Sequence, residues 1–301
     1  MTTYPPPQPD TPPRRVVSLI PSMTESLFDL GLGETLVGVT DYCPLPAAKQ
    51  GVIPRLGGTK NARTGEIIAL HPDLVILNQE ENTPAIVRAL EQAGLTLWLT
   101  FPRSVADALA DLRHLAVLFH KPEILLSVEH LERQVEIARA ASASAQPIRY
   151  FCPIWQDETP DGRRWWMTFN RKTYPHSLLS IFGGENVFAE RERRYPLEAD
   201  IGDAPAAPVE GHDTRYPRVA LDEVRAAAPE LILLPSEPYP FDETHRRELF
   251  TLLADTPAAR TGRILLLDGS LITWHGTRLG KALAVLPSLL HPAASDGGRR
   301  P

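Results

Sequence analysis

Cysteine is scarce in this sequence, with only Cys43 and Cys152 among 301 residues. Two cysteines that lie so far apart do not make a disulfide framework, and no C-x-x-C motif is present. We therefore expect both thiols to be reduced and partly buried.

Long apolar runs and basic clusters are scarce as well. No run approaches the roughly 20 apolar residues that a helix needs to cross a bilayer, so the sequence predicts no transmembrane segment. The formal net charge of −6 argues against a nucleic-acid binder. The opening sequence MTTYPPPQPDTPP lacks the apolar core of a secretory signal. As written, the chain is predicted to be cytoplasmic; a periplasmic or extracellular location is the alternative if the true start lies upstream.

The usual catalytic signatures are missing too. There is no G-x-S-x-G elbow and no phosphate-binding P-loop. Nine histidines are scattered without an H-x-x-x-H or H-E-x-x-H pair, and we place only His176 and His275 near a site. We therefore predict a protein that is not an enzyme, with no intrinsic cofactor and no metal-ligating side chain.

The stretch 103–145 organises the sequence that is present, because no glycine interrupts it. Apolar residues recur at helical spacing on both sides of Pro122, and proline fits the first turn of a helix but breaks its interior. We predict helices at about 103–119 and 122–142. The second would span roughly 30 Å. It is either an ordinary packed helix or a rod between two lobes.

The two flanks of this stretch resemble each other. Residues 66–80 (EIIALHPDLVILNQE) align without a gap on 223–237 (EVRAAAPELILLPSE), and each reads as a short helix, a proline, a buried strand and a polar turn. Strands that alternate with helices imply parallel sheets. The predicted fold class is α/β, with two lobes of mainly parallel central sheets flanked by helices and joined by one long interlobe helix. The predicted boundaries are a disordered leader at 1–13, an N-terminal lobe at 14–120, the interlobe helix at 121–146, a C-terminal lobe at 147–291 and a disordered tail at 292–301.

Ligands of open parallel sheets bind outside the carboxyl ends of the strands. Four of the five tryptophans fall in the second predicted lobe, near strand ends or turns. Their rings either pack under loops or form a surface for a large, flat, partly apolar ligand. Two acidic sites have alternatives as well. Glu80 and Glu81 form an acid pair or a solvated helix start. Ser22 and Glu25 form a capping box or contact a ligand.

The order of several longer motifs is quite specific. They are RVVSLIPSMTESLFDLGLGETLVGVTDYCPLP, GGTKN, FGGENVF, RYPRVALDEV and ILLLDG with TWHGTR. Over about residues 14–290 the chain resembles the solute-binding proteins of ABC importers for cobalamin, iron-siderophores and haem that have a helical backbone (class III). The resemblance implies two α/β lobes that move little, because a helix hinges less freely than paired strands.

The resemblance also implies a function and a set of residues. A bulky metal chelate is held between the lobes by aromatic and polar loop residues, and a monomeric binding protein docks on an ABC permease. Asn78 stands where the cobalamin binder has a tryptophan, and 190–217 is an insertion relative to the family. The ligand-binding candidates carried over by position are Tyr42, Asn78, Glu81, Trp155, Trp166, Tyr239, Trp274 and His275. The permease-docking candidates are Glu66, Asp222 and Glu223.

An alternative reading is a cytoplasmic enzyme or ligand carrier that reuses the same two-lobe scaffold. Glu80, Glu81 and His275 would then be the candidate acid–base groups.

Overall fold

The computed structural model of the protein describes residues 6–208 and 210–292. The predicted disorder of the first five residues and of 293–301 lies outside the described residues. The described part of the leader contacts the rest of the chain, because the Pro7 carbonyl accepts a hydrogen bond from His114 Nε2 at 3.0 Å. None of the helices that are described is both long and apolar enough to cross a membrane.

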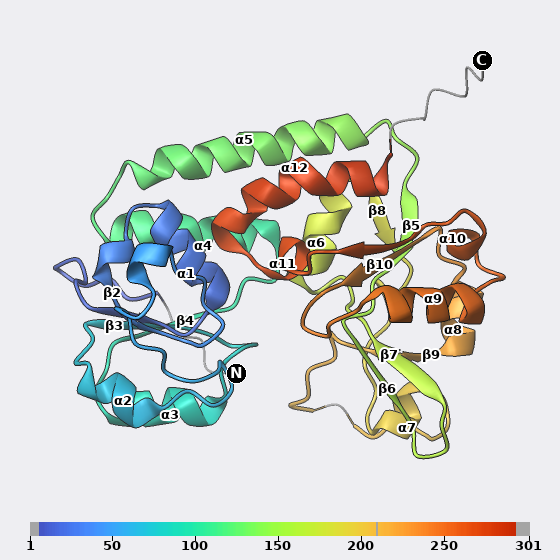
Figure 1. Cartoon of the computed structure of the whole chain (residues 1–301), viewed down its shortest axis with the longest axis horizontal. Helices are drawn as coiled ribbons and strands as arrows, with labels where there is room; N and C mark the ends of the chain where they lie inside the picture. The colour runs from blue at the N-terminus through green and yellow to red at the C-terminus, as the bar shows by residue number, and fades with distance from the viewer. Residues whose placement is uncertain (1–5, 209, 293–301) are drawn as a thin grey trace. The chain divides into compact units, whose positions relative to one another are not determined.

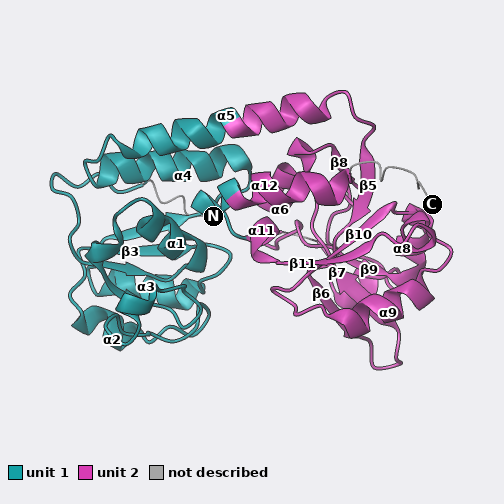
Figure 2. Ribbon diagram, turned by 45° about the horizontal axis from the view of Figure 1, so that its top comes forward, with its two compact units in different colours: residues 1–133, 274–280 teal, residues 134–273, 281–301 magenta. Residues whose placement is uncertain are grey.

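The chain divides into two compact units, coloured separately in Figure 2. Unit 1 comprises residues 1–133 and 274–280, and unit 2 comprises 134–273 and 281–301. The predicted α/β class with parallel sheets is confirmed. The return of 274–280 to unit 1 is not predicted by the sequence, because it depends on tertiary contacts alone.

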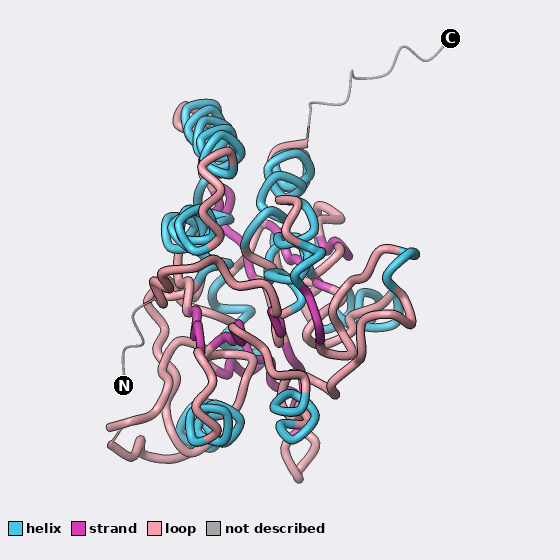
Figure 3. Tube along the Cα trace, turned by 90° about the vertical axis from the view of Figure 1, so that its left-hand side faces the viewer, coloured by secondary structure: helices cyan, strands magenta, loops and turns pink. Residues whose placement is uncertain are grey.

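Unit 1 contains a four-stranded parallel sheet in the order β2-β1-β3-β4. β3 is buried over its whole length, as its continuous apolar sequence predicts. Helices α2 and α3 cover one face of this sheet, and α1 and α4 cover the other (Figure 1). Figure 3, viewed from the side of unit 1, shows the same layering of helices around strands. The bounds are β1 Val16–Ser18, α1 Pro21–Asp29, η1 Gly33–Thr35, β2 Leu36–Val39, η2 Ala47–Lys49, α2 Thr64–Ala69, β3 Leu74–Asn78, α3 Pro84–Gln92, β4 Leu97–Thr100 and α4 Val105–Leu118.

Unit 2 contains a second parallel sheet, in the order β11-β10-β5-β8, and a small antiparallel sheet β6-β7-β9. Apolar residues of α8, α9 and α10 pack with one face of the parallel sheet. The bounds are β5 Ile148–Phe151, β6 Trp155–Glu158, β7 Arg164–Met167, α6 Tyr174–Ile181, β8 Gly184–Asn186, α7 Leu197–Asp200, β9 Arg218–Ala220, α8 Leu221–Ala227, β10 Leu231–Pro235, α9 Glu243–Leu252, α10 Pro257–Arg260, β11 Ile264–Leu267, α11 Ser270–Thr273, η3 Gly276–Arg278 and α12 Leu279–Leu290.

The long helix α5 (Ile124–Ser142) belongs to both units, because the boundary falls after Arg133 (Figure 2). The predicted helices at about 103–119 and 122–142 correspond to α4 and α5 and are confirmed within a few residues. The chain changes direction between them at His120, which has a positive φ of 52°.

The internal repeat extends to the backbone conformation. Its two copies form α2–β3 in unit 1 and α8–β10 in unit 2, and both strands are fully buried. His71 and Ala228 occupy the same place in the two copies, and each has a φ of 45°. A side chain with a Cβ adopts this left-handed conformation at a cost, so both copies keep a strained end of the helix.

The insertion 190–217 is irregular, as predicted, but it is organised around a buried carboxylate. Asp200, at the end of α7, is 1% exposed. Its Oδ2 accepts hydrogen bonds from the backbone N–H of Arg218 at 2.8 Å and from Arg218 Nε at 2.9 Å. Its Oδ1 lies 3.1 Å from Arg191 Nη1, and Arg191 Nε lies 2.8 Å from Glu223 Oε1. This Asp200 cluster joins the insertion to α8.

Candidate functional site

The loop that follows β3 is organised by the side chain of Asn78, which is 2% exposed. Asn78 Oδ1 accepts hydrogen bonds from the backbone N–H groups of Glu80 at 2.7 Å and Glu81 at 3.2 Å. Its Nδ2 donates to Thr100 Oγ1 at 3.3 Å. Asn78 therefore forms an Asx turn. The suggested helix start at Glu80 and Glu81 is wrong, because α3 begins only at Pro84.

Tyr42, after the end of β2, is the most exposed of the predicted ligand-binding aromatics, at 69%. Its ring lies against Gly58, where an added Cβ would come within 3.2 Å of Tyr42 Cε2. Asn82 Nδ2 donates to the Thr59 carbonyl at 2.9 Å and thereby ties this glycine loop to the loop after β3. Tyr42 therefore lies beside a glycine loop that a partly buried hydrogen bond joins to the loop after β3.

The turn that carries Trp274 and His275 docks on α1, within unit 1. Arg278 Nε donates to Glu25 Oε2 at 2.8 Å, and the Arg278 guanidinium lies 4.8 Å from the centroid of the Trp274 ring. His275 Nε2 lies 3.4 Å from Ser22 Oγ. One face of α1 thus holds the half-buried Trp274 in place.

The predicted capping box at Ser22 and Glu25 is therefore wrong. α1 begins at Pro21, and its N-cap residue Ile20 has no side chain that could accept a hydrogen bond. Ser22 and Glu25 lie inside the helix, where they are available to the turn from the end of the chain.

Burial lowers the pKa of His275 to about 4, because the charged imidazolium loses its hydration. At neutral pH the ring is therefore uncharged. His275 is only 6% exposed, so its role is to support the turn that carries Trp274.

Unit 2 presents two aromatic rings after the ends of β5 and β10. Trp155 is 42% exposed, and its ring lies 5.4 Å from that of the half-buried Tyr239 at an interplanar angle of 75°. We name this pair the aromatic shelf. Gln156 Nε2 donates to the Tyr239 hydroxyl at 3.2 Å, and His245 Nε2 lies 3.3 Å from the same oxygen. Three polar or aromatic side chains therefore fix the position of Tyr239.

The hydrogen-bond direction in this network is set by Trp166. Its indole Nε1 can only donate, and it donates to Gln156 Oε1 at 3.3 Å. The Gln156 amide must then direct its NH₂ group toward Tyr239. His245 Nδ1 lies 2.7 Å from Asp242 Oδ1 and 3.2 Å from the Asp242 nitrogen, so Asp242 orients the imidazole.

Trp166 itself has no surface for a ligand. It is fully buried, and its ring packs edge-on against Phe151 with centroids 6.3 Å apart. For this residue the packing alternative holds, and its predicted contact with a ligand is not supported by its position. Its neighbour Trp165 is also buried, at 8% exposure.

The three predicted docking residues differ in how their charges are used. Glu66 forms an exposed ion pair with Arg63 at 2.6 Å, and Glu223 is paired with Arg191. The side chain of Asp222 is 94% exposed. Asp222 is therefore the docking candidate that solvent reaches most freely.

Sequence reasoning missed His245, Arg278 and the orienting role of Gln156. Arg278 and Gln156 act through partners that are remote in the sequence. His245 contacts the nearby Asp242 and Tyr239, and only its capping position on α9 gave a local signal. His176 on α6 is half-buried, and burial lowers the pKa of its imidazole. Across residues 6–208 and 210–292, no three His, Cys, Asp or Glu side chains converge as a metal site would require.

Two separate α/β sheets and one helix shared by both units define a two-lobed binding-protein fold. The chain belongs to the periplasmic binding protein family, whose model matches residues 16–271.

Known relatives are similar in sequence, and solved structures share the fold. The vitamin B12-binding protein of Vibrio cholerae serotype O1 (strain ATCC 39541) is 30% identical over 186 residues, which cover 62% of this chain and 64% of that protein. The vitamin B12-binding protein of Yersinia pestis (strain Pestoides F) is 28% identical over 183 residues, which cover 60% of this chain and 62% of that protein. The chain thus spans less than two thirds of the length of these curated relatives.

The crystal structure of the periplasmic vitamin B12 binding protein BtuF of Vibrio cholerae superposes with a TM-score of 0.71 at 22% identity, covering 93% of this chain and 97% of that one. The apo form of the periplasmic heme-binding protein RhuT from Roseiflexus sp. RS-1 superposes with a TM-score of 0.68 at 25% identity, covering 92% of this chain and 97% of that one.

Proposed function

We propose that this protein is a solute-binding protein of an ABC-type importer and that it binds a bulky metal chelate of the cobalamin, ferric-siderophore or haem type. The observation that carries the proposal is the aromatic shelf. Trp155 is a large hydrophobic side chain left 42% exposed at the strand ends of a sheet whose other aromatics are mostly buried. Flat, partly apolar chelates offer rings that such a surface stacks against.

The polar groups around the aromatic shelf orient the Tyr239 hydroxyl toward a bound ligand. Gln156 donates to the Tyr239 oxygen, so the hydroxyl hydrogen of Tyr239 points to His245 or outward to a ligand. In unit 1, taken by itself, Tyr42 and Trp274 with its stacked Arg278 are the groups that we propose for ligand binding. Asn78 and His275 are buried polar residues that hold the loop after β3 and the turn with Trp274 in place.

The family and the names of the relatives favour binding over the alternative of an enzyme on the same scaffold. The relatives named periplasmic likewise favour a periplasmic or extracellular location over the cytoplasmic one expected from the opening residues. We propose that the protein works there as a monomer and delivers its chelate to a permease, with Asp222, Glu223 and Glu66 as docking residues.

Fluorescence titration of the full chain with cyanocobalamin, haemin and ferrichrome tests the proposal. We expect one of these chelates to quench tryptophan emission saturably. Trp155→Phe should lower the affinity for that chelate about tenfold, because it reduces the exposed stacking area. Trp98→Phe is the matched control, since Trp98 is 1% exposed and should leave affinity unchanged. Absence of saturable binding for all three chelates would overturn the proposal.

A further inference from the structure

The Tyr239 hydroxyl of the aromatic shelf lies in the middle of a chain of hydrogen bonds. At one end, Trp166 Nε1 donates to Gln156 Oε1, so Gln156 Nε2 donates to the Tyr239 oxygen at 3.2 Å. At the other end, His245 Nε2 lies 3.3 Å from the same oxygen, and His245 Nδ1 lies 2.7 Å from Asp242 Oδ1. We name this chain the Tyr239 relay. The direction of the Tyr239 hydrogen depends on which nitrogen of the imidazole carries a proton.

Asp242 is held as a carboxylate at the start of α9. Its Oδ1 accepts hydrogen bonds from the backbone N–H groups of Thr244 at 2.8 Å and His245 at 3.1 Å. These bonds, the one from His245 foremost, lower the pKa of Asp242, because they stabilise its charged form. A carboxylate can only accept hydrogen bonds, so the imidazole nitrogen that faces it must donate.

The neutral His245 ring therefore carries its proton on Nδ1. In the other tautomer, Nδ1 would accept from the Asp242 backbone N–H at 3.2 Å, and its lone pair would face the carboxylate oxygen at 2.7 Å. A hydrogen bond to a carboxylate is roughly twice as strong as one between neutral groups, so the Nδ1–H tautomer is favoured. Nε2 is then an acceptor and takes the hydrogen of the Tyr239 hydroxyl.

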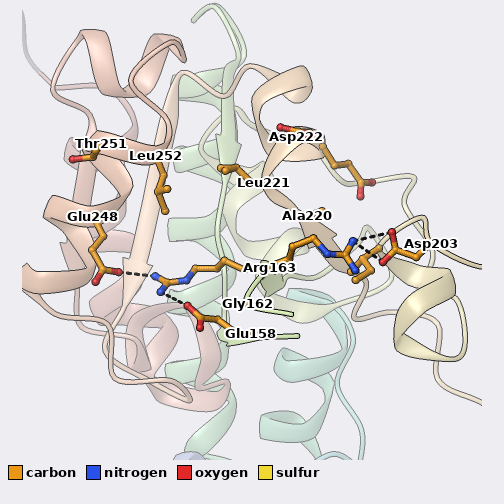
Figure 4. Close-up of a pocket in the computed structure, with 13 residues that line it drawn as sticks. Glu158, Gly162, Arg163, Asp203, Ala220, Leu221, Asp222, Glu248, Thr251 and Leu252 are labelled. Atoms are coloured by element: carbon orange, nitrogen blue, oxygen red, sulfur yellow. Dashed lines mark hydrogen bonds and ion pairs between the residues drawn. The ribbon is translucent and has the colours of Figure 1, made fainter. Parts of the chain in front are cut away.

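The β6–β7 hairpin and α9, which carry the relay, are joined at a second place. Arg164 lies 2.7 Å from Glu158 and 2.6 Å from Glu248, and Figure 4 shows this guanidinium between the two carboxylates. Gln156 and Glu158 are two residues apart on β6 and so project from the same face of the hairpin. His245 and Glu248 are three residues apart on α9 and so lie on one side of the helix. The same two surfaces therefore meet at both contacts, which keeps the relay in register.

We propose that Asp242 and His245 are positioning residues that make the Tyr239 oxygen a hydrogen-bond acceptor for the ligand. The oxygen accepts one hydrogen bond from Gln156 and gives its own hydrogen to His245, so one lone pair remains for a donor. The aromatic shelf then selects a chelate whose periphery carries neutral amide N–H groups over one with carboxylates there. A carboxylate at this place would meet a lone pair and lose the hydrogen bonds it makes in water. This preference rests on the proposed function, because it concerns the ligand of the same shelf.

Imidazole ¹⁵N–¹H correlation spectra of the full chain test the relay without any ligand, because the ¹⁵N shifts of Nδ1 and Nε2 distinguish the two tautomers. The spectrum of His245→Phe identifies the His245 signals by their loss. At about pH 8, where an unperturbed imidazole is neutral, we expect the His245 proton on Nδ1. A proton on Nε2 would overturn the inference.

Fluorescence titration with cyanocobalamin and with its separate monocarboxylic acids tests the preference for the ligand. Each acid differs from cyanocobalamin in one peripheral amide, which is replaced by a carboxylate. We expect at least one acid to bind about tenfold more weakly, the cost of one lost hydrogen bond. Tyr239→Phe should remove this difference, because it removes the oxygen but keeps the ring.

His245→Phe separates a positioning role from a merely structural one. The new ring would keep the edge-on contacts that His245 makes with Tyr239 and Phe241, but it would offer no acceptor to the Tyr239 hydrogen. The hydroxyl would then donate outward, so the disfavoured acid should bind about as well as cyanocobalamin. Loss of a structural support alone would weaken both compounds by the same factor. The matched control is His130→Phe, at an exposed position of α5, which should leave the ratio of affinities unchanged.

Equal affinity for cyanocobalamin and all of its acids, or an unchanged ratio in His245→Phe, would overturn the inference. If haemin binds and cyanocobalamin does not, the inference falls and the proposed function stands. If cyanocobalamin, haemin and ferrichrome all fail to bind, the proposed function falls together with the ligand preference, whereas the imidazole spectra still decide whether the Tyr239 relay exists.

Discussion

The buried Asp200 offers the sharpest test of how unit 2 is stabilised. Its carboxylate accepts hydrogen bonds from the backbone N–H groups of Arg194 at 2.9 Å and Arg218 at 2.8 Å, and it neutralises the side chains of Arg218 and Arg191. Removing one partner of a buried ion pair costs about 3–5 kcal/mol. We expect Asp200→Ala to fall near the lower limit, because Arg191 keeps Glu223 at 2.8 Å.

Asp200→Asn should cost less, about 2 kcal/mol, since the amide still accepts one hydrogen bond but loses the charge. Urea unfolding measures the global change, and amide hydrogen exchange of 190–218 measures the local one. A loss of about 3 kcal/mol corresponds to exchange more than a hundredfold faster at the Arg194 and Arg218 amides.

Asp222→Ala is the matched control, because it removes the same carboxylate from a site that is 94% exposed. If Asp200→Ala unfolds at the same urea concentration as Asp222→Ala, the Asp200 cluster does not hold the insertion, and our account of it is wrong.

Three further predictions concern stability. Burial, with a contribution from Asp107, raises the pKa of Asp111 to about 7, so the folded state gains stability as pH falls from 7 toward 4. Asp111→Asn should abolish that gain and should stabilise the protein by about 2–4 kcal/mol at pH 8, as measured by urea unfolding. The pKa of His275 is lowered to about 4, so its contribution to folding stability is present above pH 6.5 and is lost toward pH 4, by up to about 3 kcal/mol. His275→Gln should remove this pH dependence of stability, and a variant that keeps the dependence would contradict us. Ala228→Gly should raise the free energy of unfolding by about 1 kcal/mol, because glycine adopts a φ of 45° without strain. Ala227→Gly, at the last residue of α8, should lower the free energy of unfolding. If both variants change the thermal midpoint equally, Ala228 is not strained.

The Asp111 and His275 effects have opposite signs in overlapping pH ranges. The native protein should therefore show a flatter pH profile than either variant. This cancellation is itself a measurable consequence, because each single variant should expose the slope due to the other group.

Most elements were predictable because their signals are local. Continuous apolar runs gave β3 and β10, helical spacing around Pro122 gave α4 and α5, and the repeat indicated two α/β units. These signals report burial of a strand or of one helix face, which a sequence window of ten to twenty residues contains.

The site was predicted less completely, because its geometry depends on contacts between distant residues. Ser22 and Glu25 match a capping pattern, yet they face His275 and Arg278 from the far end of the chain. Trp155 and Trp166 both belong to the antiparallel hairpin, yet one is 42% exposed and the other fully buried. Composition cannot distinguish these two rings, since only Trp166 belongs to the buried cluster that contains Phe151 and Leu249.

The two surfaces that we propose for ligand and partner share a physical design. Tyr239 is half-buried, and the side chain of Asp222 is 94% exposed. Buried polar groups lie behind both: Trp166 holds Gln156, which donates to Tyr239, and the Asp200 cluster holds Glu223, the neighbour of Asp222. A buried polar group holds its geometry because breaking its hydrogen bonds leaves unpaired groups away from water. Substitutions in these buried groups should therefore disturb binding without touching either the chelate or the partner.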